Sequence, residues 1–195
     1  NSTIHNCQGY GLAISYAKVQ VYNTQISNTL THCLYVEGGH VDVNNSTIAQ
    51  FYPFDGNRRS AIGFKAPIDT LDVRNSLVTG YGNDEVLWTP VEDEPLKFSF
   101  DHCVLRTEKM MTEDSLRFTH VVYEDVKDTT MYGEKHFSVF DTENLIYDFH
   151  LSAKSAAIGA ADPKTALPYD RNGLKREEDK ADAGCFLHRE EKKEE

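Results

Sequence analysis

Two aspartates at equivalent positions of a sequence repeat are the residues best placed to do chemistry. Asp42 and Asp72 each lie three residues before an asparagine and between two apolar residues, and His40 and Arg74 flank them. On neighbouring strands about 4.8 Å apart, such carboxylates could raise one another's pKa or share a cation such as Ca²⁺. A carboxylate or imidazole can act as a general base, and an arginine can neutralise a substrate carboxylate. Two carboxyls at a controlled separation can instead hydrolyse a glycosidic bond.

The same residues also have a purely structural explanation, because alternating polar residues occur on any sheet face that meets water. We therefore treat His40, Asp42, Asp72 and Arg74 as candidate substrate contacts and assign no catalytic residue. Trp88, the only tryptophan, is a further candidate, because it falls in a long insertion where we expect exposure. The eight histidines and four cysteines show no metal-ligand spacing, so we expect no metal site and no cofactor, apart from the Ca²⁺ ion considered above.

The repeat that carries these residues occupies the first half of the chain. Its clearest copies, which align without gaps, are residues 21–26, 43–48 and 73–78. One column of the repeat contains Asn1, Asn23, Asn45, Asn75 and His102, at intervals of 22, 22, 30 and 27 residues. Self-similarity at such a period predicts a solenoid, in which each unit buries its apolar face by stacking on the next.

Each unit has the periodicity of β-strands. Before the column, apolar residues alternate with polar ones, as in the pairs Val19/Val21, Val41/Val43, Leu71/Val73 and Phe98/Phe100. This alternation predicts half-buried strands and hence an all-β, single-stranded parallel β-helix with coils of about 22 residues. The outward residues should then form three rows across the coils: Lys18/His40/Thr70/Lys97, Gln20/Asp42/Asp72/Ser99 and Tyr22/Asn44/Arg74/Asp101.

The asparagine column fits the bend between two strands. Asparagine tolerates the left-handed backbone of a sharp bend, and its amide can stack on its own copies and bond to neighbouring backbone. N-glycosylation is the rival explanation, since Asn1 and Asn45 both begin an acceptor pattern. Asn23 and Asn75 occupy the same column without that pattern, so we favour the ladder.

The spacing of the repeat also suggests the organisation of the chain. We expect coils over 1–107 with insertions near 51–59 and 80–95, then final irregular coils over 108–150. A closing segment (151–188) and a disordered charged tail (189–195) would follow.

Composition excludes some classes of partner. The net charge of −11 and the pI of about 5.1 argue against nucleic acid, and no apolar run is long enough to span a membrane. The chain opens inside a repeat, so we expect further coils upstream, and the lack of a signal peptide says nothing about export. The four cysteines are expected to be buried thiols, with one disulfide as the alternative.

A series of phrases near the C-terminus carries a family resemblance. They are Phe137–Asp141, Tyr147–Leu151, Ser155–Asp162, Pro168–Gly173 and Asp182–Phe186. The series resembles the closing segment of bacterial pectate-lyase-like right-handed parallel β-helix proteins. It departs from that family's pattern at Ala156, Ala161, Ala183 and Phe186. The resemblance implies a right-handed solenoid and a structural segment laid along the outside of the coils. It also implies that sugar contacts, where present, lie on an outward sheet face.

These observations favour a non-catalytic extracellular domain, secreted or on a bacterial cell surface, that recognises a polysaccharide or cell-surface glycan or serves as a surface scaffold. The alternative is a polysaccharide lyase or glycoside hydrolase. Its active site would lie on the outward sheet face or in missing upstream coils.

Overall fold

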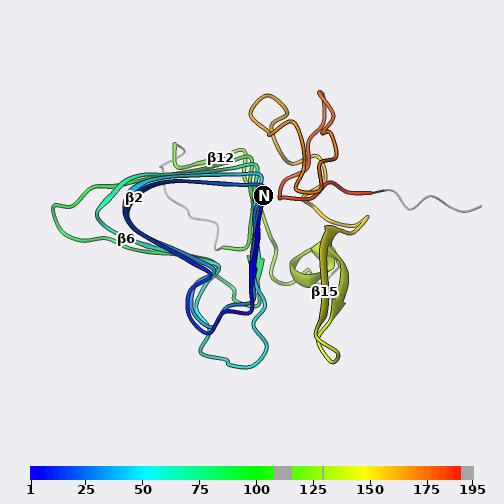
Figure 1. Cartoon of the computed structure of the whole chain (residues 1–195), viewed down its shortest axis with the longest axis horizontal. Coiled ribbons are helices and arrows are strands. Elements are labelled where there is room, and N and C mark those ends of the chain that lie inside the picture. The colour runs from blue at the N-terminus through cyan, green and yellow to red at the C-terminus, as the bar shows by residue number, and fades with distance from the viewer. Residues whose placement is uncertain (108–115, 129, 190–195) are drawn as a thin grey trace, which may run out of the picture.

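The computed structural model describes residues 1–107, 116–128 and 130–189. They form an all-β parallel solenoid of about four turns, which confirms the predicted fold class. Figure 1 shows the successive coils lying over one another, with the C-terminal part of the chain along one side of the stack. Of the expected charged tail, only Arg189 lies within the described residues.

The coils contribute to two parallel sheets. The first sheet contains β1 (Thr3–His5), β3 (Gln25–Ser27), β5 (Thr47–Gln50), β8 (Leu77–Gly80), β11 (Val104–Leu105) and β13 (Val122–Tyr123). The second contains β2 (Leu12–Tyr22), β4 (Leu34–Asn44), β6 (Ile62–Lys65), β7 (Ile68–Arg74), β9 (Val86–Thr89), β10 (Leu96–Asp101) and β12 (Phe118–Thr119). A 3-10 helix, η1 (Gly133–His136), then leads into an antiparallel hairpin of β14 (Phe137–Asp141) and β15 (Ile146–Leu151).

The second sheet is bent, so each coil has three sides. The first part of β4 pairs with β6, and its last five residues pair with β7. Gly38 and Gly39 lie between these parts, each with a φ of 78°. A Cβ atom at Gly39 would lie 2.2 Å from the carbonyl oxygen of Ala17 on the preceding coil. Only glycine fits there, because it combines the positive φ with this close approach.

The main core fills the interior of the coils. Inward residues of both sheets meet there, such as Ile48 and Val78 of the first sheet and Val43 and Phe100 of the second, and all four are fully buried. The predicted alternation is therefore correct for the second sheet, where the row Gln20, Asp42, Asp72 and Ser99 is exposed or half-buried. The strands of the first sheet from β3 to β11 are instead buried on both faces.

The closing segment and the β14–β15 hairpin together cover the outer face of the first sheet. Ala49, Leu77 and Val104 point away from the coil interior and join a second apolar cluster, which includes Ala157 and Cys185. Figure 1 shows the closing segment, in orange and red, beside the edge of the coils on which the N-terminus lies. The placement agrees with the expected wrap along the outside of the stack.

The asparagine column occupies the expected bends but makes different bonds. Asn23, Asn45 and Asn75 have φ values of 45°, 44° and 50°, so the predicted left-handed bends are confirmed. Their side chains bond mainly to the closing segment, whereas we expected bonds to one another and to neighbouring backbone. One bond of the expected kind is present, from Asn45 Nδ2 to the Asn75 carbonyl at 3.5 Å. The contacts run from Asn23 Nδ2 to the Tyr169 carbonyl (2.8 Å), from the Leu167 N–H to Asn45 Oδ1 (2.7 Å) and from the Asp162 N–H to Asn75 Oδ1 (2.9 Å). Asn45 is fully buried, which removes it as a glycosylation site in this fold.

All four cysteines are free. Cys33, Cys103 and Cys185 are buried, and burial raises the pKa of the first two thiols to about 12 and of the third to about 11. These three thiols pack as small apolar side chains and are inert at neutral pH. Cys7 is half-buried.

Candidate functional site

The outward face of β2, β4, β7 and β10 brings most of the candidate residues together. Strand pairing places Asp42 directly beside Asp72, and the row continues to Gln20 on one side and Ser99 on the other. The register predicted for this row is therefore confirmed. The row Tyr22/Asn44/Arg74/Asp101 is also confirmed, whereas a bulge between Leu96 and Phe98 breaks the third row before Lys97.

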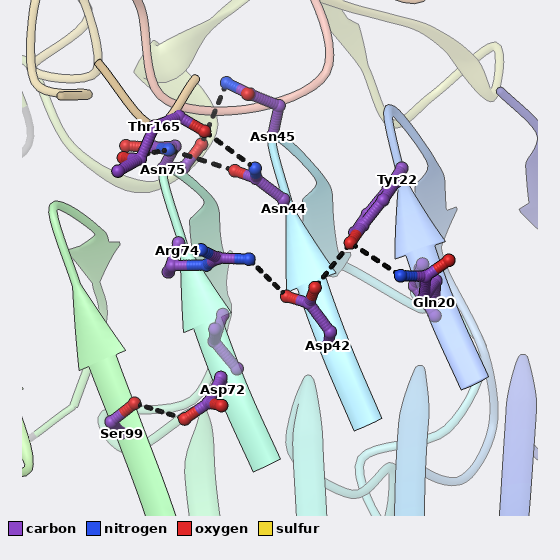
Figure 2. A network of polar contacts seen from close by, with 12 residues as sticks. Gln20, Tyr22, Asp42, Asn44, Asn45, Asp72, Arg74, Asn75, Ser99 and Thr165 are labelled. Carbon is purple, nitrogen blue, oxygen red and sulfur yellow. Dashed lines mark hydrogen bonds and ion pairs between the residues drawn. The ribbon is translucent and has the colours of Figure 1, made fainter. Parts of the chain in front are cut away.

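Asp42 is the centre of a hydrogen-bond network, shown in Figure 2. The Tyr22 hydroxyl donates a short hydrogen bond to one of its oxygens, and an Arg74 NH group donates to the other at 2.8 Å. Gln20 Nε2 in turn donates to the Tyr22 hydroxyl at 3.0 Å. The bond to Asp42 is the main cause that raises the pKa of Tyr22, with smaller contributions from burial and from the charge of Asp42. Burial disfavours the charge on Arg74, but the bond to Asp42 and its charge outweigh this and raise the pKa of the guanidinium.

Asp72 has a separate partner. The Ser99 hydroxyl donates to Asp72 Oδ1 at 2.7 Å, as Figure 2 also shows. The two carboxylates lie on adjacent strands, but each is held by its own donors from neighbouring coils. Because the bonds to both carboxylates join one coil to the next, these side chains present fixed polar groups along the sheet.

The remaining two candidates lie in different surroundings. His40 is exposed, and its Nδ1 lies 2.7 Å from the Thr70 hydroxyl. Trp88 differs from the expected exposed loop residue, because part of the second insertion forms β9, which pairs with β6. The indole therefore points inward and packs on Phe64 and Phe98, with ring centroids 5.8 and 5.2 Å away.

An aromatic cluster on the other part of the second sheet was missed. Tyr10, His32 and Tyr35 lie with ring centroids 5.1–6.2 Å apart, and Tyr10 is 45% exposed. A Cβ atom at Gly63 would lie 2.5 Å from the His32 ring, so this glycine makes room for the imidazole. Burial lowers the pKa of His32, which favours the neutral ring. The sequence signal was the spacing of Tyr10 and His32, which is one 22-residue repeat.

A group of possible metal ligands was also missed. Asp101, His102 and His120 come together at the bend after β10. Burial opposes the charge on Asp101, but hydrogen bonds from Thr119 and His120 and the nearby imidazole of His102 outweigh it and lower the pKa of the carboxyl. His102 had been assigned to the asparagine column, and its φ of 49° confirms that place. His120 follows only 18 residues later and was not recognised as the next member.

Among the described residues, no helix is long and apolar enough to cross a membrane. Comparisons of the chain with protein-family models, with curated proteins and with solved structures gave no match.

Proposed function

We propose that the outward face of the second sheet recognises carbohydrate without cleaving it, in a secreted or bacterial cell-surface protein. The single observation that carries this proposal is the row of outward polar side chains from Gln20 to Ser99, in which hydrogen bonds from neighbouring coils fix Asp42 and Asp72. Equivalent groups recur at each strand spacing of about 4.8 Å. A surface that repeats in this way suits a ligand that also repeats, such as a polysaccharide.

The chemistry of the face agrees with sugar binding. Asp42 and Asp72 accept hydrogen bonds, Arg74 donates them, and their positions are set before any ligand arrives. Prior ordering lowers the entropy cost of binding. Tyr10 and Tyr35 add aromatic rings on the adjoining part of the same sheet, where the apolar face of a sugar ring could stack.

The engagement of the carboxylates favours recognition over catalysis. A general base must lie within reach of the proton that it removes. Tyr22 and Arg74 donate to the two oxygens of Asp42 and occupy part of the space around them, so a substrate proton has less access to this carboxylate. The Arg74 guanidinium is already paired with the Asp42 carboxylate. Arg74 is therefore less able to neutralise the carboxylate of an acidic sugar. The resemblance of the closing segment to that of pectate-lyase-like proteins supports an extracellular carbohydrate role, with a lyase or hydrolase as the alternative.

The proposal is tested by a screen of the purified chain against neutral and acidic polysaccharides. Binding is measured by gel retardation, and the release of unsaturated or reducing ends is measured in parallel. We expect retardation by at least one polysaccharide and no products. Sugar products would replace the proposal with the enzymatic alternative, and silence in both assays would favour a scaffold.

Two variants then locate the binding face. Asp72→Ala removes a fixed acceptor and Tyr10→Ala removes an exposed ring, and we expect each to weaken binding about tenfold, the effect of losing about 1.4 kcal/mol. Glu143→Ala is the matched control, because this exposed acidic residue lies in the turn of the β14–β15 hairpin. Equal binding by all three variants would place the ligand elsewhere.

A further inference from the structure

The bend after β10 gathers one carboxylate and two imidazoles. Asp101 Oδ1 lies 3.1 Å from Nδ1 of His102 and 3.1 Å from Nδ1 of His120. One possible ligand atom from each residue can be chosen so that all three lie within 4.8 Å of one another. Asp101 and His102 are half-buried, whereas the side chain of His120 is 69% exposed, so the group is open to solvent on one side.

The fold explains why these three residues converge. Neighbouring side chains of a strand point to opposite faces, but His102 has a left-handed backbone that breaks this alternation. Asp101 and His102 can therefore face the same space. Coil stacking adds the third residue, because Asp101 pairs with Thr119 and the His102 N–H bonds to the Thr119 carbonyl. The two imidazoles consequently stack, with ring centroids 4.3 Å apart and planes inclined by 26°.

One polar atom of this cluster lacks a hydrogen-bond partner among the described residues. It is His102 Nδ1, which is buried, and the Asp101 carboxylate lies close to it without forming a well-aligned hydrogen bond. A buried polar atom without a partner costs free energy. Thr119 donates to Asp101 Oδ1 at 2.6 Å and so helps to orient the carboxylate, as an outer partner of a metal ligand does.

We propose that Asp101, His102 and His120 bind a divalent transition-metal ion, with zinc as the reference ion. Imidazole and carboxylate together are typical zinc ligands, whereas Ca²⁺ prefers oxygen alone. Two ligand atoms on a tetrahedral zinc ion lie about 3.4 Å apart, given bonds of about 2.1 Å. The observed 3.1 Å separations are close to this, so small side-chain rotations would suffice. Three protein ligands leave the fourth coordination position of a tetrahedral zinc ion for water. This metal site does not depend on sugar binding by the sheet face.

The test is isothermal titration of the metal-stripped chain with zinc chloride. We expect one zinc ion per chain. His102→Asn and His120→Asn should each weaken binding about tenfold or more, since each removes a ligand. Asparagine is the matched replacement, because it occupies this column in the preceding coils with the same left-handed backbone. His5→Asn, at an exposed histidine outside the cluster, should bind zinc as the wild type does.

Either of two results would overturn the proposal: no zinc binding by the wild type, or equal binding by the wild type and both column variants. Circular dichroism without metal checks that each variant is folded. If His102→Asn does not fold, the test uses His120→Asn, at an exposed position, and Asp101→Asn. Equal zinc binding by these two variants and the wild type would then overturn the proposal. Zinc should also raise the melting temperature of the wild type but not that of His120→Asn.

Discussion

Asn45 is the residue whose replacement tests most directly how the closing segment is held. Its Oδ1 accepts a hydrogen bond from the Leu167 N–H at 2.7 Å, and its backbone is left-handed with a φ of 44°. Asn45→Ala therefore has two separate costs. It leaves the Leu167 N–H without its hydrogen-bond acceptor. It also places alanine in the left-handed backbone region, which asparagine tolerates better because its side chain can form local hydrogen bonds.

Both costs can be estimated. An orphaned buried N–H costs about 1–3 kcal/mol. The left-handed backbone costs an ordinary L-residue about 1–2 kcal/mol. Asn45→Ala should therefore lower the free energy of unfolding by roughly 2–5 kcal/mol, the sum of both terms. Asn45→Gly tolerates the backbone and should lose only about 1–3 kcal/mol.

Urea unfolding followed by circular dichroism measures these differences as shifts of the midpoint at constant slope. Asn6→Ala is the matched control, because Asn6 has a φ of 55° but an exposed side chain, so only the backbone cost should appear. If Asn45→Gly were as stable as the wild type, the bond to Leu167 would not hold the segment. If the alanine and glycine variants were equal, the backbone reasoning would be wrong.

Two further predictions concern the interior and the closing segment. Glu85 is buried and accepts hydrogen bonds from the Ala61 and Gly82 N–H groups, and burial raises its pKa to about 8. Because this pKa exceeds the unfolded value of 4.5, the carboxyl's contribution to stability is complete below about pH 4.5 and is lost as the pH rises through 8. Urea unfolding should therefore show the wild type losing stability relative to Glu85→Gln between about pH 5 and pH 8, and parallel pH profiles would contradict this. Deleting residues 152–195 should expose the outer face of the first sheet and cause self-association in size-exclusion chromatography, whereas a soluble monomer would show that the face needs no cover.

The features that could be predicted from the sequence are the strands, their pairing across coils and the left-handed bends, because these depend on local residue patterns. Strand alternation and the alignment of Asn45 with Asn75, across an interval of 30 residues, were enough to place Asp42 beside Asp72, and the asparagine column correctly indicated left-handed bends. A regular solenoid makes this possible, because each residue's neighbours on the next coil are one repeat away.

The partners of those residues could not be predicted in the same way. The bonding of the asparagines depends on where the closing segment lies, and that segment is more than eighty residues away from them in sequence. Trp88 was expected in a loop because the interval lengthens there, but the inserted residues include a strand. His120 was missed because the interval shortens to 18 residues, so the His102–His120 pair is apparent only in three dimensions.

The bonds between the asparagine column and the closing segment tie the length of that segment to the number of coils in the stack. Successive anchor points on Asn23, Asn45 and Asn75 bind main-chain groups of one continuous stretch, so the segment's length matches a fixed number of coils. A coil inserted between Asn23 and Asn75 would move the anchors apart by about 4.8 Å and leave the segment out of step. The Arg171 side chain also bonds to Ser2 and Thr3 on the preceding coil, so the solenoid can be lengthened without disturbing this match only before Ser2 or beyond Asn75.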